Sequence, residues 1–135
     1  MTKRLFVRKA QQEKIVTPSI VFAVEEHAKF IVFRLQGVIN MSTVAELQVF
    51  GDKWRQQGRL RPRHILLDFQ KVTATDSAAV AMLVLAASTL KKQNHELGVI
   101  NIDEKLRFMF ELFKVYYIFS IFCDEEAAVK KFSKE

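Results

Sequence analysis

Short apolar runs alternate with helix-like segments along most of this chain, and that alternation limits the folds open to it. The expected strands cover residues 20–24, 30–35, 65–69, 97–101 and 118–122. Amphipathic spacing indicates helices over residues 43–57, 77–94, 103–113 and 124–132. The first two strands can form a hairpin, and helical crossovers between the later strands favour parallel neighbours. We therefore expect a single α/β domain, ordered ββαβαβαβα, with a mixed, mostly parallel sheet of about five strands and about four helices.

Most of the positive charge of the chain lies near its N-terminal end. Residues 1–14 hold five basic residues and one acidic residue, a net +4 of the total +6, so the other 121 of the 135 residues carry +2. We interpret residues 1–18 as a basic N-terminal tail and residues 19–135 as the folded domain. Such a tail is typical of a solvated arm. We expect no nucleic-acid partner, and membrane contact only indirectly or through the tail.

Residues that could hold a cofactor or a metal do not group together in the sequence. Only four glycines are present, and none forms a phosphate-binding loop. His27, His64 and His95 lie in separate turns or element ends, without the spacing of metal ligands. The single Cys123 excludes an internal disulfide, and its apolar surroundings predict a buried thiol. We expect a protein that is not an enzyme and has no cofactor or metal.

The sequence shows no signal for export or membrane insertion. Residues 1–14 are polar and basic, without the apolar core of a secretory signal. The longest nearly continuous apolar stretch, residues 78–87, is too short to span a bilayer. We expect a soluble, cytoplasmic protein, and its oligomeric state is left open.

Asp76 and Ser77 stand where a strand and a polar loop give way to a helix. A helix N-terminus offers unpaired N–H groups and the positive end of the helix dipole. The hydroxyl of Ser77 is therefore either a helix cap or a group whose charge can be changed by modification. It lacks the flanking glycines of a nucleophile elbow, and no histidine is placed to act as its base.

These residues together resemble the STAS domain, which is named for sulphate transporters and anti-sigma factor antagonists. The main likeness is Ile-Leu-Leu-Asp-Phe at residues 65–69, followed by Val-Thr-Ala-Thr-Asp-Ser at residues 72–77. Weaker likeness extends to the first helix, Leu83 and residues 30–37, 96–101, 112–121 and 125–128. The resemblance covers roughly residues 19–132 and leaves the basic tail outside.

The resemblance implies a role for Ser77. In the antagonist branch of the family, a partner serine kinase, often the anti-sigma factor itself, phosphorylates the matching serine, and a serine phosphatase restores it. The unmodified domain binds its partner and the modified domain releases it. The chain is thus expected to be an anti-sigma factor antagonist-like module in a partner-switching pathway. The expected contact surface around Ser77 consists of Val38, Ile39, Asn40, Met41, Thr73, Thr75, Asp76, Ala78, Ala79 and Met82.

The sequence departs from the family pattern at two places. After Asp-Ser the family usually has a small residue and then Gly, where this chain has Ala78-Ala79-Val80. The last connection usually carries Gly-Leu, where this chain has Lys114-Val115. Two other functions stay open: an accessory STAS subunit of a lipid-type ABC transporter, and a stressosome-like scaffold that self-assembles.

Overall fold

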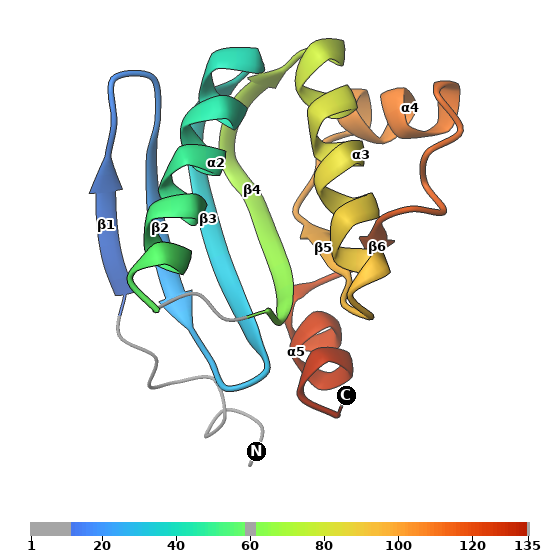
Figure 1. Ribbon diagram of the computed structural model, residues 1–135. Coiled ribbons are helices and arrows are strands. Elements are labelled where there is room, and N and C mark those ends of the chain that lie inside the picture. The colour runs from blue at the N-terminus through green and yellow to red at the C-terminus, as the bar shows by residue number, and fades with distance from the viewer. Residues whose placement is uncertain (1–11, 59–61, 135) are drawn as a thin grey trace.

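The computed structural model describes residues 12–58 and 62–134 and shows a single α/β domain (Figure 1). Its elements, in chain order, are β1 (Gln12–Val16), β2 (Val21–Glu26), β3 (Phe30–Ile39), α2 (Met41–Gln56), β4 (His64–Thr75), α3 (Ser77–Lys92), β5 (Leu97–Ile100), α4 (Glu104–Leu112), β6 (Ser120–Ile121) and α5 (Glu125–Lys134). The expected α/β fold and the alternation of strands and helices after β3 are confirmed.

The six strands form one sheet in the order β1-β2-β3-β4-β5-β6. The pairs β1–β2 and β2–β3 are antiparallel, whereas β3–β4, β4–β5 and β5–β6 are parallel. The hairpin and the mostly parallel sheet were both expected, but the strand count is one higher. The extra strand is β1, which lies within the segment interpreted as a tail. Residues 1–11 of that segment lie outside the described residues.

The sequence pattern did not predict β1 because the strand lies at the edge of the sheet. Four of its five residues are exposed, so the Gln-Glu-Lys-Ile-Val segment shows no alternation between a buried face and a solvated face. Its place is set by pairing with β2, where Lys14 lies opposite Ala23. The folded part of the chain therefore begins before residue 19.

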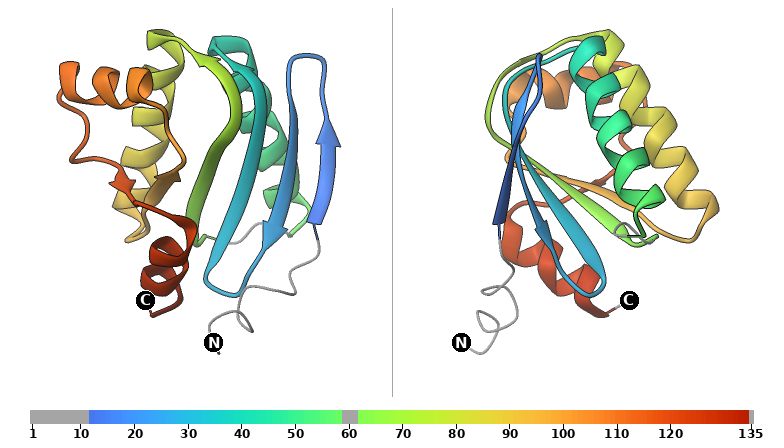
Figure 2. Two further views of the ribbon diagram at one scale, coloured as in Figure 1. Left: turned by 180° about the vertical axis from the view of Figure 1, so that it is seen from behind. Right: turned by 60° about the vertical axis from the view of Figure 1, so that its left-hand side comes forward.

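Side chains alternate between two apolar layers on opposite faces of the sheet. On β3, Ile31 and Phe33 join the larger core formed with α2, α3 and α4, whereas Phe30 and Val32 join the smaller core formed with α5. Figure 2 shows α2 and α3 on one side of the sheet and α5 on the other. A Cβ added to Gly98 would lie 2.8 Å from Phe122 Cε2, so glycine is needed beneath α5.

Two parallel strands run further than the apolar pattern indicated. The expected strands end at residues 35 and 69, but β3 continues to Ile39 and β4 continues to Thr75. The strands stay paired to their ends, with Ile39 opposite Thr75. Gly37, at φ +94°, lies beside a register shift in β3 and marks an irregularity within the strand.

The helix α2 begins at Met41, two residues before the expected start at residue 43. Asn40 caps it by accepting a hydrogen bond from the Thr43 backbone N–H, and the Thr43 hydroxyl accepts one from the Asn40 N–H. Glu46 accepts hydrogen bonds from the Thr17 hydroxyl and the Ser19 N–H. Asparagine caps a helix as well as threonine does, so the helix can begin at this earlier position.

Two further local expectations were wrong. Cys123 is exposed and not buried. The last strand is limited to Ser120 and Ile121, where we expected five residues, because β5 offers only a short edge for pairing. As for membrane insertion, none of the helices in the described residues combines the length and apolarity needed to span a bilayer.

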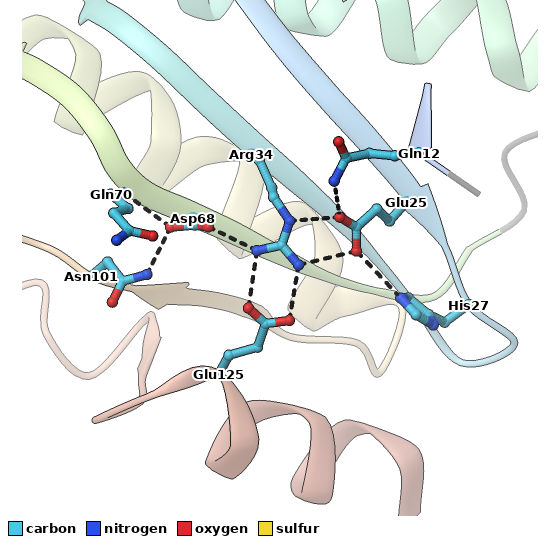
Figure 3. Close-up of polar contacts among 8 residues, drawn as sticks. All are labelled: Gln12, Glu25, His27, Arg34, Asp68, Gln70, Asn101 and Glu125. Carbon is cyan, nitrogen blue, oxygen red and sulfur yellow. Dashed lines mark hydrogen bonds and ion pairs between the residues drawn. The ribbon is translucent and has the colours of Figure 1, made fainter. Parts of the chain in front are cut away.

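A polar cluster centred on Arg34 joins the smaller core to the sheet (Figure 3). The Arg34 guanidinium donates to Glu25 of β2 through Nε (2.6 Å) and Nη2 (3.0 Å). It donates to Glu125 of α5 through Nη1 (3.0 Å) and Nη2 (2.9 Å), and to Asp68 of β4 through Nη1 (2.8 Å). All five guanidinium N–H groups are therefore used, and three elements are held by one side chain.

The same contacts set the charge states in the cluster. Burial raises the pKa of the Glu25 carboxyl, but the side chains of His27, Arg34 and Gln12 favour its ionised form and lower that pKa to about 2. Burial lowers the pKa of Arg34, yet its bonds to Glu125, Glu25 and Asp68 raise it above its ordinary range. Glu25 and Arg34 are therefore both ionised near neutral pH.

We predict that Arg34→Met strongly destabilises the fold, because it leaves three carboxylates without their common partner. Breaking a buried ion pair costs about 3–5 kcal/mol. The lower end applies because the Arg34 side chain is 25% exposed. The matched control is Arg55→Met, whose ion pair with Asp52 has both side chains 62% exposed and should contribute less than about 1 kcal/mol. Equal losses for the two variants in urea unfolding would contradict this role of Arg34.

We also predict that acid weakens the fold through Glu25. Its pKa in the folded state lies below the ordinary value of 4.5, so its contribution is complete above about pH 4.5. The contribution is lost as the pH falls from there toward 2, and amounts to at most about 3 kcal/mol. Urea unfolding between pH 5.5 and pH 3 should show a shallower decline of the unfolding free energy for Glu25→Gln than for the wild type. Parallel declines would contradict the prediction.

Candidate functional site

Ser77 lies at the first position of α3, directly after the cap. Asp76, and not Ser77, caps the helix: its Oδ1 accepts from the Ala79 N–H at 2.8 Å, and its carbonyl accepts from the Val80 N–H at 3.2 Å. Ser77 is exposed. Among the described residues its hydroxyl has no hydrogen-bond partner. The structure thus leaves this hydroxyl available to an enzyme or a partner.

The N-termini of α2 and α3 lie side by side at the same edge of the sheet (Figure 1). The cause is the full-length pairing of β3 with β4, since both strands end together and each leads into a helix. The Asp76 N–H donates to the Ile39 carbonyl at 3.3 Å and ties the two turns together. The first turns of α2 and α3 consist of uncharged residues, so two helix N-termini lie near Ser77, and the acidic side chain at the start of α3 is that of its cap, Asp76.

Most residues of the expected contact surface lie on the surface near Ser77. Val38, Met41, Thr73 and Asp76 are exposed, and Asn40, Thr75, Ala78 and Met82 are half-buried. The pairing of β3 with β4 brings the segments around residues 38–41 and 73–78 together, although they are far apart in sequence.

Two residues of that expected surface are inaccessible. Ile39 and Ala79 are both fully buried, at 0% exposure, in the larger core. Ile39 is buried because β3 extends to this residue and its side chain joins the larger core. Ala79 faces inward because it is two residues after the first position of α3, on the same side as Val80 and Leu83. A partner at this surface cannot touch either side chain.

Two exposed apolar residues on the outer faces of the helices were not expected from the sequence. Val49 lies two turns after Met41 on α2, and Leu85 lies two turns after Ser77 on α3. Val49 is 59% exposed and Leu85 is 66% exposed. The sequence contained a signal for them: Val49 follows Met41 by eight residues and Leu85 follows Ser77 by eight residues, which places each pair on one side of its helix. Together with Met41, they extend the surface around Ser77 along both helices.

The two departures from the family pattern have clear structural settings. Ala79 occupies the place where the family usually has Gly, and its methyl group is part of the core. Lys114 follows α4 with φ +57°, a left-handed conformation that favours glycine. The Lys114 N–H donates to Glu111 and the Val115 N–H donates to Phe110, which is the hydrogen-bond pattern of a glycine-type helix end.

Comparison with known proteins gives one consistent result. A sequence model of the STAS domain matches residues 21–128. The fold is similar to that of the proposed anti-sigma factor antagonist TM1081 of Thermotoga maritima, with a TM-score of 0.71 and 14% identity over 83% of this chain and 94% of that chain. An anti-sigma factor antagonist from Mycobacterium paratuberculosis gives a TM-score of 0.69 and 21% identity, over 88% and 99% of the two chains.

A third similar protein has been solved in two chemical states. SpoIIAA of Bacillus in its phosphorylated form gives a TM-score of 0.57 and 19% identity, over 91% of this chain and 98% of that chain. The unphosphorylated form of SpoIIAA gives a TM-score of 0.56 with the same identity, over 91% and 96%. No curated protein matches the sequence significantly. At these identities the structural likeness establishes the fold.

We predict that Asp76→Ala weakens the start of α3 without changing the fold. Loss of the cap leaves the Ala79 N–H without its acceptor and should lower the unfolding free energy by about 1 kcal/mol. Asp76→Asn is the matched control, because asparagine caps equally well but carries no charge. Urea unfolding should place Asp76→Asn within about 0.5 kcal/mol of the wild type. A loss as large as that of Asp76→Ala would show that the charge, and not the cap, matters.

Proposed function

Because the chain belongs to the STAS domain family, we propose that it is a phosphorylation-controlled binding module, similar to an anti-sigma factor antagonist. Ser77 is the proposed switch residue. A serine kinase that is also the binding partner, or acts with it, modifies Ser77, and a serine phosphatase reverses the modification. The chain serves as substrate and ligand in this scheme and contributes no catalytic residue.

The observation that carries the proposal is that Asp76 caps α3 and Ser77 does not. Asp76 supplies the cap, so modification of the Ser77 hydroxyl removes no hydrogen bond from the described structure. A serine that capped the helix would lose its capping geometry on modification. Here the modified group is exposed and the helix keeps its start. The solved phosphorylated and unphosphorylated forms of SpoIIAA show that this fold tolerates the change in that protein.

The helix ends also suit a phosphate group at this position. A phosphoserine carries about −1.5 to −2 charges at pH 7 and three acceptor oxygens. The unpaired N–H groups and the positive dipole end of α3 favour such a group, and α2 presents a second N-terminus nearby. We therefore expect phosphorylation of Ser77 to leave the fold intact.

The surrounding surface explains how the same group can release a partner. Met41, Val49 and Leu85 are exposed apolar side chains on α2 and α3, and they suit a partner that covers them. A phosphate at Ser77 would have to be desolvated under such a partner, and the exposed carboxylate of Asp76 adds a like charge next to it. A cost of about 3 kcal/mol weakens binding by roughly two orders of magnitude.

We predict that Ser77→Asp weakens partner binding by about 100-fold, whereas Ser77→Ala binds like the wild type. The tagged wild-type chain is used to recover partners, and affinities of the variants for the recovered protein are then measured by calorimetry. Ser133→Asp is the control, because it places the same charge at an exposed position on α5, at the opposite face of the sheet. Mass spectrometry of the recovered chain tests directly for phosphate on Ser77.

The outcomes separate the proposed function from its alternatives. Recovery of a serine kinase, with phosphate on Ser77, supports the switch. Equal affinities for Ser77→Asp and Ser77→Ala would contradict it. Recovery of an ABC ATPase, with Ser77 unmodified, would assign the chain to a transporter complex instead.

A further inference from the structure

A second exposed apolar surface lies outside the region around Ser77. Five large side chains within ten consecutive residues of α4 and the following connection are 43–67% exposed. They are Phe108, Leu112, Phe113, Tyr116 and Tyr117, and we call them the aromatic edge. Isolated exposed apolar residues are ordinary, but a group of this kind in one short segment marks an interaction site.

The fold holds the aromatic edge at the periphery of the molecule. Leu106 and Phe110 of α4 are buried in the larger core, so Phe108 and Leu112, which are one turn apart, share an outer face of the helix. Figures 1 and 2 show α4 and the connection to β6 outside α3, at the end of the sheet opposite β1. The described residues leave this surface uncovered.

Its area is sufficient for a small interface between two copies. A buried Phe or Tyr covers about 150–250 Å². Side chains that are about half exposed therefore present roughly 100 Å² each, or about 500 Å² for the aromatic edge. Two copies meeting through this surface would bury about 1,000 Å² in total, which is the lower limit for a specific interface.

The charges of the segment favour a second copy over an anionic membrane. Residues 103–117 contain three acidic and three basic residues, a net charge of zero in a chain of +6. Membrane-binding aromatic segments carry an excess of Lys and Arg, and this one does not. A neutral region is also where two chains of charge +6 repel each other least.

The charged side chains within the aromatic edge can complement themselves. Arg107 and Glu111 are exposed and lie one turn apart on α4. Within the described part of the chain neither side chain makes an ion pair. Across a two-fold axis, Arg107 of one copy can face Glu111 of the other, and the reciprocal pair follows by symmetry.

We propose that two copies of this chain associate through the aromatic edge in a symmetric dimer. Phe108, Leu112 and the two tyrosines form its apolar centre, and Arg107 and Glu111 pair at its rim. The Ser77 surface stays outside the interface, so the dimer presents two switch sites to its partners. The proposed dimer does not depend on phosphorylation of Ser77.

Sedimentation equilibrium of the full chain tests the proposal. Between about 1 and about 200 µM, the apparent mass should rise from the monomer mass of 15.7 kDa toward twice that value. The double variant Phe108→Ser with Leu112→Ser should weaken association at least about tenfold, and its thermal unfolding should stay unchanged because both positions are exposed. The control is Val49→Ser with Leu85→Ser, which removes equally exposed apolar side chains from the other surface.

A charge exchange tests the two-fold arrangement. Arg107→Glu alone should weaken association, and Arg107→Glu combined with Glu111→Arg should restore it. A chain that stays monomeric up to about 200 µM would overturn the proposal, including the case in which the monomer binds phosphatidylglycerol vesicles instead. Loss of association in Ser77→Asp or in the Val49/Leu85 control would also overturn it, because the copies would then meet through the other surface.

Discussion

The Arg34 guanidinium donates all five of its N–H groups to carboxylates from β2, β4 and α5. Through these bonds α5 is held on the second face of the sheet, where Phe132 and Val129 pack on Phe30 and Val32. Without α5, this apolar layer would face water and the sheet would have only one covered side. The cluster thus connects residues from the N-terminal hairpin to the C-terminal helix.

The parallel pairing of β3 with β4 has the corresponding role at the other end of the sheet. Because Ile39 lies opposite Thr75, the two strands end together and release α2 and α3 from adjacent points. That geometry places two helix N-termini beside Ser77. Asp76 caps α3, so the Ser77 hydroxyl makes no hydrogen bond among the described residues.

The molecule therefore carries two surfaces with different chemistry. The region around Ser77 combines exposed apolar residues with helix N-termini, and under the proposed function a phosphate there would change its affinity for a partner. The aromatic edge has no comparable helix N-terminus, and its charges balance. The proposed switch surface and the proposed dimer surface lie on separate elements, so under both proposals one chain would change partners while it remains paired with its copy.

The sequence alone determined the alternation of strands and helices and the position of Ser77 at a helix start, because these depend on local periodicity and capping. The tertiary structure decided the rest. Polar β1 becomes a strand only by pairing with β2, and β3 and β4 are extended only by pairing with each other. Ile39 and Ala79 are buried in the core and so are removed from the expected contact surface. The carboxylates around Arg34 come from segments up to 91 residues away in the sequence. Such features depend on contacts between distant segments, which the periodicity of a single chain does not encode.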